Sequence, residues 1–145
     1  RAKITRKAGG FGRHGAGASS AAAQAFLMLL VDTSVWVDHL RRGDAEMAKR
    51  LDEGVVMTHR LVIEELACGS MARRGEILSL LETLPRAPEA DHNEFLHFVE
   101  SRGLAGSGLG VVDAHLLAST RLAHACLWTR DGALARAAAK LGVGS

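Results

Sequence analysis

The sequence is poor in the residues on which several kinds of small protein depend. It has two cysteines among 145 residues, and Cys68 and Cys126 lie in apolar stretches without a CxxC spacing. Disulfide scaffolds and zinc ribbons are therefore excluded, and we expect both thiols to be buried in a protein of a reducing, cytoplasmic compartment. The longest uninterrupted apolar run covers residues 25–31. This is far short of the roughly 20 residues that span a membrane, so no transmembrane segment is predicted.

Acidic residues are missing from the first 27 positions. That segment carries five basic residues and is otherwise rich in Gly, Ala and Ser, with too little apolar surface to offset the entropy of ordering it. We expect residues 1–27 to be a flexible basic extension of non-native or upstream origin, and the folded domain to occupy residues 28–145. Positions 28–145 hold 13 basic and 16 acidic residues. A globally basic nucleic-acid-binding domain is therefore not supported.

Strand-like and helical patterns alternate from residue 27 onward. Short apolar runs predict strands at 27–31, 55–58 and 125–129, the first of them buried on both faces. Helical patterns and their capping residues predict helices at 34–40, 45–51, 61–69, 75–84, 91–103, 111–124 and 133–141. Four glycines in the segment 103–110 predict a loop. Strands that alternate with helices indicate an α/β fold with a parallel sheet covered on both faces.

Two aspartates follow predicted strands. Asp32 comes directly after the run 27–31, and Asp131 follows the run 125–129. The carboxyl ends of strands in open α/β sheets are where such folds bind their ligands. Aspartate is also a favoured N-cap of the helix that comes next, and for either residue alone that explanation is the better one.

A third acid, Asp113, is predicted to point inward. On a helix it shares a face with Leu116, Leu117 and Thr120, because residues three, four and seven positions apart line one side. An ionised carboxylate on a buried face is costly unless it is paired or bound to a metal. An N-terminal cap after the glycine-rich loop explains Asp113 about equally well.

A fourth acid is either Glu64 or Glu65. Glu65 shares helical spacing with Leu61 and Val62 and is predicted to face the core, whereas Glu64 lies four residues after Arg60 and is predicted to form a solvated ion pair. The spacing favours Glu65 only modestly.

Acids that converge on one edge of a sheet repel one another unless a cation neutralises them. Ligation by carboxylate oxygens alone suits Mg²⁺ or Mn²⁺, which share their coordination with substrate phosphates. The pattern of acids therefore points to phosphoryl-transfer or phosphodiester chemistry.

Four segments in order carry a family resemblance: LLVDTSVW at 29–36, Glu65-Leu66 with Gly69, VDAHLLA at 112–118, and WTRD at 128–131. They resemble PIN-domain ribonucleases of the VapC type, the toxins of type II toxin–antitoxin (VapBC) modules. The resemblance runs from about residue 28 to the end of the chain. It implies a PIN-like three-layer α/β/α sandwich around a mostly parallel sheet. It also implies a metal-dependent endoribonuclease that leaves a 3′-OH and a 5′-phosphate.

The resemblance also implies roles for individual residues. Metal ligands would be Asp32, Glu65, Asp113 and Asp131, and the residues that position a ligand, a water or a carboxylate would be Thr33, Ser34 and Thr129. It further implies a homodimer, an RNA substrate, and a VapB-type antitoxin whose C-terminal segment occupies the acidic groove through a basic side chain. One hypothesis is that the basic extension is antitoxin-derived or antitoxin-like, with Arg6 or Arg13 reaching the site.

Two alternatives are a metal-dependent binding module and a catalytically silent PIN fold. Asp32-Thr33-Ser34 begins like the D-x-S-x-S motif of adhesion-type metal sites, but Trp36 stands where the second serine belongs. An aspartyl phosphatase would need Asp in place of Ser34. Loss of catalysis has no support in the sequence, because all four acidic positions are filled.

Overall fold

The computed structural model describes residues 27–145, so nearly all of the predicted basic extension lies outside the described residues. Three parallel strands form the centre of the fold: β1 (Leu29–Val31), β2 (Val56–Met57) and β3 (Cys126–Trp128). Their order is β2-β1-β3, with β1 in the middle. Single parallel bridges join Thr58 to Arg86 and Leu127 to Gly144 and widen the sheet at both edges.

The central strand is buried on both faces, as its sequence predicts. Leu30 and Val31 point to opposite faces of the sheet, and neither side chain is exposed to solvent. Burial of each stabilises the fold by about 1.5–3 kcal/mol relative to an exposed side chain. A strand of this kind requires helices on both sides.

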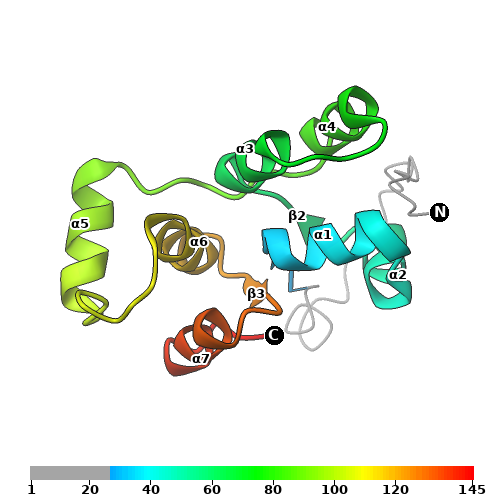
Figure 1. Ribbon diagram of the computed structural model, residues 1–145. Coiled ribbons are helices and arrows are strands. Elements are labelled where there is room, and N and C mark those ends of the chain that lie inside the picture. The colour runs from blue at the N-terminus through cyan, green and yellow to red at the C-terminus, as the bar shows by residue number, and fades with distance from the viewer. Residues whose placement is uncertain (1–26) are drawn as a thin grey trace, which may run out of the picture.

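The described part of the chain has seven helices around or beside the sheet: α1 (Thr33–Arg42), α2 (Ala45–Asp52), α3 (Arg60–Cys68), α4 (Arg74–Glu82), α5 (His92–Ser101), α6 (Val111–Leu122) and α7 (Gly132–Lys140). Figure 1 shows α3 and α4 on one side of the strands and α7 on the other. The predicted α/β fold with a covered parallel sheet is confirmed, and each predicted helix is found with its bounds shifted by at most a few residues.

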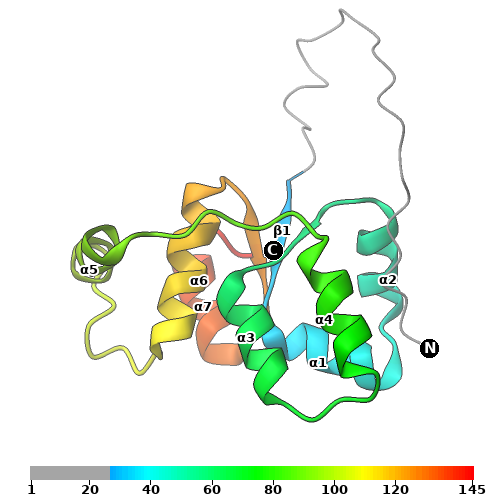
Figure 2. The same cartoon turned by 90° about the horizontal axis from the view of Figure 1, so that it is seen from above.

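Helix α5 lies at one end of the molecule, joined to the rest by the extended segment 83–91 and packed against α6 (Figures 1 and 2). None of its ten residues is buried. Phe95 stacks on His115 of α6 with ring centroids 3.9 Å apart. Phe95 and Phe98 are thus only partly buried, whereas Trp36 on α1 is fully buried.

The expectation that both cysteines are buried is wrong for Cys68. It is the last residue of α3, beside exposed Gly69, and its side chain faces solvent, while Cys126 is half-buried on β3. The apolar face of α3 ends at Leu66, so the final turn of the helix has no core to contact. Within residues 27–145 no helix is both long and apolar enough to cross a membrane.

Candidate active site

The carboxyl ends of two adjacent strands bring the first acids together. The backbone N–H of Asp32, after β1, donates to the carbonyl of Trp128, the last residue of β3, at 2.9 Å. Figure 2 shows that α1, α6 and α7 all begin at this edge of the sheet. Asp32 precedes α1, Asp131 precedes α7, and Asp113 lies in the first turn of α6.

Asp32 is held by two hydroxyl groups. Its Oδ2 accepts hydrogen bonds from Ser34 Oγ at 2.7 Å and from Thr129 Oγ1 at 2.8 Å. The residue is only 7% exposed, and its side chain makes no cap hydrogen bond to α1. Capping therefore does not account for Asp32. Its other oxygen, Oδ1, has no hydrogen-bond partner among the described residues.

The two hydroxyls also tie the loop after β3 to this carboxylate. Ser34 Oγ accepts from the backbone N–H of Arg130, and Thr129 Oγ1 accepts from the backbone N–H of Asp131, each at 3.0 Å. Since each hydroxyl donates to Asp32 while it accepts from the backbone, its hydrogen has a defined direction. The orientation of Asp32 is therefore set from both sides.

Thr33 differs from the other two predicted hydroxyl residues. Its Oγ1 is buried and has no hydrogen-bond partner within residues 27–145. The residue lines a small cavity of about 120 Å³ together with Glu65 and Gly69. An unsatisfied buried hydroxyl beside an acid is a group that a water or a ligand can satisfy.

Asp113 lies within the electrostatic influence of the other acids. Its pKa is raised first by burial, then by the negative charges of Asp32 and Asp131 and, least, by that of Glu65, while a hydrogen bond with the Gly110 backbone lowers it. The helix face that it shares with Leu116, Leu117 and Thr120 is buried as predicted, and Asp113 itself is half-buried at the end of that face. The other three predicted acids therefore act on this one carboxyl group.

Asp131 combines a capping role with a place at this edge. Its Oδ1 accepts a 2.9 Å hydrogen bond from the backbone N–H of Leu134, so it is an N-cap of α7. The residue is exposed, and its charge raises the pKa of Asp113. Capping and a functional role are compatible here, because the cap uses one oxygen.

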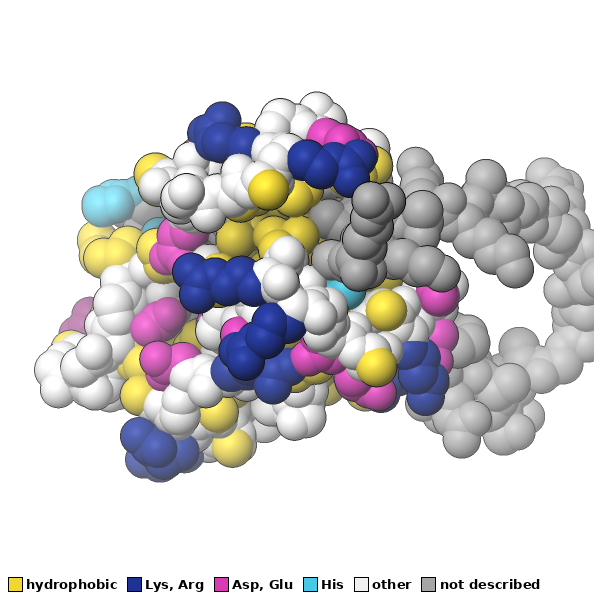
Figure 3. All heavy atoms as spheres, turned by 45° about the vertical axis from the view of Figure 1, so that its right-hand side comes forward, with side chains coloured by type: hydrophobic (Ala, Val, Ile, Leu, Met, Phe, Trp, Pro, Cys, Tyr) yellow, Lys and Arg dark blue, Asp and Glu magenta, His cyan; other side chains and the backbone are white. Residues whose placement is uncertain are grey.

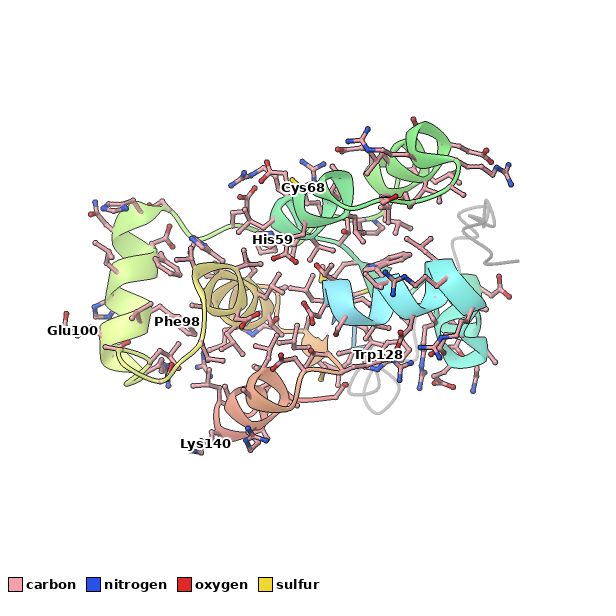
Figure 4. The ribbon with its side chains drawn as sticks, viewed as in Figure 1. His59, Cys68, Phe98, Glu100, Trp128 and Lys140 are labelled. Carbon is pink, nitrogen blue, oxygen red and sulfur yellow. The ribbon has the colours of Figure 1, made fainter. Side chains whose placement is uncertain are left out.

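The prediction that Glu65 faces the core is wrong, since its side chain is exposed. The buried face of α3 is formed by Val62, Ile63 and Leu66, which places Glu65 at the margin of that face. The predicted ion pair of Glu64 is present, with Arg60 Nη1 2.9 Å from its Oε1. Glu65, and not its neighbour, is among the charges that raise the pKa of Asp113, so the structure favours Glu65 over Glu64 more clearly than the spacing does. Figure 4 labels His59, which caps the start of this helix, and Cys68, its last residue.

Arg130 contributes to this network although residue spacing did not single it out. Its backbone takes part in the hydroxyl network, while its guanidinium pairs with Asp38 at 3.0 Å and also with Asp44. Both carboxylates belong to the α1–α2 region, so the cation is paired with acids other than the four predicted ones. No local spacing signals this contact, because Asp44 is 86 residues away in the chain.

Comparison with known proteins identifies the family. Residues 29–140 match the model of the PIN domain. The chain belongs to the PIN-domain family. Ribonuclease VapC32 of Mycobacterium tuberculosis, in strains CDC 1551 and H37Rv, is 50% identical to it over 117 residues, which are 80% of this chain and 94% of the relative. The resemblance to VapC ribonucleases is therefore confirmed.

A solved structure supports the fold of this PIN domain. The crystal structure of PAE2754 from Pyrobaculum aerophilum aligns with a TM-score of 0.54 at 20% sequence identity, and the alignment covers 77% of this chain and 79% of that chain. At this identity the likeness shows the fold alone. With the helices found on both sides of the sheet, it confirms the PIN-like sandwich.

The acids of this PIN domain have the chemistry of a divalent-cation site. Within residues 27–145, no three His, Cys, Asp or Glu side chains are close enough to form a ready-made metal cluster. The donor set nevertheless fits Mg²⁺ or Mn²⁺, because it consists of hard carboxylate oxygens. Asp32 Oδ1 has no partner in this part of the chain, and the charges of three acids raise the pKa of Asp113. A bound cation would relieve that repulsion.

Proposed function

We propose that this PIN domain is an endoribonuclease toxin of a type II toxin–antitoxin module and hydrolyses RNA phosphodiester bonds with Mg²⁺ or Mn²⁺. Asp32, Glu65, Asp113 and Asp131 would hold the metal. The observation that carries the proposal is that Asp32, held by Ser34 and Thr129, shares one edge of the sheet with the helix starts that carry Asp113 and Asp131. The name of the Mycobacterium tuberculosis relative, a ribonuclease, supports RNA as the substrate.

The site residues divide into ligands and positioning groups. A divalent ion bound by the acids supplies Lewis-acid polarisation of a phosphate and makes water more acidic. Ser34 and Thr129 hold Asp32 in one orientation through hydrogen bonds to a single oxygen, which leaves the other oxygen for a ligand. The unsatisfied Thr33 hydroxyl is placed to bind a water or a phosphate oxygen.

An RNA-cleavage assay on the full chain tests this proposal. Labelled total RNA and short single-stranded and hairpin RNAs would be incubated with Mg²⁺, Mn²⁺ or EDTA, using the wild type, Asp32→Asn and Asp113→Asn. A matched control is Asp52→Asn, which removes an exposed carboxylate on α2. We expect metal-dependent cleavage that is lost in both site variants and retained in the control, with circular dichroism unchanged in all four proteins.

Two results would contradict the proposal. Cleavage that persists in EDTA would exclude metal dependence. A folded wild type that binds Mn²⁺ but cleaves none of the RNAs would favour the silent PIN fold or the binding module.

We infer that a VapB-type antitoxin inhibits the enzyme by placing a basic side chain among the acids. We also infer that the enzyme encounters this antitoxin and its RNA substrate in the cytoplasm. Glu65 and Asp131 are both exposed, so a cation from a partner can reach them without unfolding the site. The expected result is that a co-purified antitoxin blocks cleavage. Replacing its inserted Arg or Lys with Gln should restore activity while the complex persists.

We further propose that the chain is a homodimer through the α5–α6 end of the molecule. Leu96 on α5 is 51% exposed and Leu122 on α6 is 45% exposed. A groove of about 420 Å³, lined in part by Phe98 and Leu122, runs between the two helices. Light scattering after size exclusion should show a dimer for the wild type and for Leu27→Asp, a control at another exposed leucine. It should show a monomer for Leu96→Asp/Leu122→Asp.

A further inference from the structure

A groove with a basic lining lies between α7 and the loop that follows α5. Its volume is about 350 Å³, and three of its ten lining residues are cations: Arg102, Arg136 and Lys140. No acidic residue lines it. Apolar side chains, among them Leu104 and Leu109, form much of the rest. Figure 4 shows Lys140 at the outer side of α7, pointing away from the sheet.

The three cations of this groove differ from most arginines of the domain. Arginines in ion pairs with carboxylates are Arg42, Arg50, Arg60, Arg73, Arg86 and Arg130. Figure 3 shows Lys and Arg side chains interspersed with acidic ones over the visible face. Within residues 27–145, by contrast, Arg102, Arg136 and Lys140 form no ion pair. Their charges are therefore available to an external anion.

Both walls of the groove lead to the acidic site. On one wall, Arg136 lies against the start of α7, since a Cβ on Gly132 would be 3.2 Å from its Nη1, and Gly132 directly follows Asp131. On the other wall, Leu109 stands four residues before Asp113. In Figure 2 the loop after α5 returns to the edge of the sheet at which α6 and α7 begin.

We propose that this groove binds the phosphate backbone of the RNA strand beside the bond to be cleaved, a proposal that rests on the ribonuclease function above. A cationic surface without acids complements a polyanion, and guanidinium groups suit phosphate oxygens because they donate two parallel hydrogen bonds. The acids of the active site repel RNA when no metal is bound. Cations next to them are therefore needed to hold the strand near the site.

Salt-dependent RNA binding by the full chain tests the proposal. Fluorescence anisotropy of a labelled single-stranded RNA of mixed sequence would be measured in EDTA, so that metal-dependent cleavage does not interfere. The groove variant is Arg102→Gln/Arg136→Gln/Lys140→Gln. The matched control, Arg42→Gln/Lys49→Gln/Arg73→Gln, removes the same charge from exposed positions on α1, α2 and the start of α4.

We expect the groove variant to bind RNA about 10- to 100-fold more weakly near 0.1 M salt. The slope of log affinity against log salt should fall by about two, since each phosphate contact to a single strand contributes roughly 0.7. The control should keep the wild-type slope. In Mg²⁺, the groove variant should show a raised KM and an unchanged kcat, because its residues bind the strand and do not touch the reacting phosphate.

The other outcomes separate this proposal from the ribonuclease function. An equal loss of RNA affinity in both triple variants would overturn the proposal that the groove binds RNA. So would the absence of RNA binding by the wild type. If the wild type cleaved RNA with the same KM as the groove variant, RNA binding by the groove would be overturned. The proposed ribonuclease function would be unaffected. RNA binding that depends on the groove, without RNA cleavage in any of the metals tested, would support the groove and overturn the ribonuclease function. If polyglutamate bound more tightly than RNA, and its binding depended on the groove, the RNA proposal would be overturned. The ligand of the groove would then be an acidic peptide.

Discussion

The Thr129 hydroxyl donates a 2.8 Å hydrogen bond to the Asp32 carboxylate across 97 positions of the chain. The bond joins the ends of β1 and β3, and it reaches the oxygen that also accepts from Ser34. Two donors on one oxygen hold the carboxylate in a single orientation, which preorganises it for a ligand on the other oxygen. The neighbouring strands thus supply both the acid and the group that positions it.

Replacing Thr129 with Val should therefore impair both the fold and the reaction. The change preserves the size of the side chain but removes the donor to Asp32 and the acceptor for the Asp131 N–H. We expect a loss of about 1–3 kcal/mol in the free energy of unfolding, measured in urea, and a drop of about tenfold or more in kcat/KM. Thr129→Ser keeps the hydroxyl and should stay close to the wild type. Equal activity of the Val and Ser variants would contradict the positioning role.

Metal binding should stabilise the folded domain. An ion that binds only the native state adds about 2.7 kcal/mol at a concentration one hundred times its Kd. We expect Mn²⁺ to raise the Tm of the wild type in a scanning calorimeter and EDTA to reverse the shift. Asp32→Asn should show little or no rise. A rise of the same size in that variant would place the ion elsewhere.

The adjacent pair Glu64 and Glu65 offers a matched test on one helix. Glu65→Gln removes a charge that acts on Asp113, and we expect RNA cleavage to fall by about tenfold or more. Glu64→Gln breaks a surface ion pair with Arg60, which contributes at most about 1 kcal/mol, and cleavage should be unchanged. The opposite ranking of the two variants in a cleavage assay would assign the site to Glu64.

The buried His59 should make stability depend on pH. Its Nδ1 accepts from the backbone N–H of Leu61 at 3.0 Å, so the proton of the neutral ring is on Nε2, which lies 3.0 Å from Ser119 Oγ. Burial lowers the pKa of His59 below its ordinary 6.5, against an opposing effect of Glu89. The unfolded chain therefore takes up a proton at a higher pH than the folded one. This contribution to stability is complete above about pH 6.5 and is lost as the pH falls below that value.

Urea unfolding between pH 7.5 and pH 5 measures this effect. We expect the free energy of unfolding to fall with pH in the wild type, and less steeply in His59→Asn, whose side chain can still cap α3. His124→Asn is the matched control, since His124 is exposed and adopts a left-handed conformation that Asn tolerates. An identical slope in His59→Asn and the wild type would show that His59 does not carry the pH dependence.

The basic extension outside the described residues also yields a prediction. If residues 1–27 imitate an antitoxin segment, the fragment 28–145 should cleave RNA faster than the full chain at an unchanged Tm. Arg6→Gln/Arg13→Gln in the full chain should reproduce part of that gain. A cleavage rate unaffected by the deletion would rule out autoinhibition by the extension.

Local pattern was enough to predict the α/β architecture and to place Asp32, Asp113 and Asp131 at the starts of the helices where the structure has them. Leu30 and Val31 belong to a run too apolar for any place but a covered central strand, and the helical period puts Asp113 on the buried face of α6. These features depend on neighbours within one turn or one strand. They can be derived before any tertiary contact is known.

Packing between distant segments decided the rest. Only the side-by-side placement of β1 and β3 brings Thr129 to Asp32. The packing of α3 through Val62, Ile63 and Leu66 leaves Glu65 and Cys68 in solvent. The partners of Arg130 and the groove around Arg136 likewise join segments far apart in the chain. Such contacts depend on how whole helices and strands pack around the core. Residue spacing along the chain does not predict that packing.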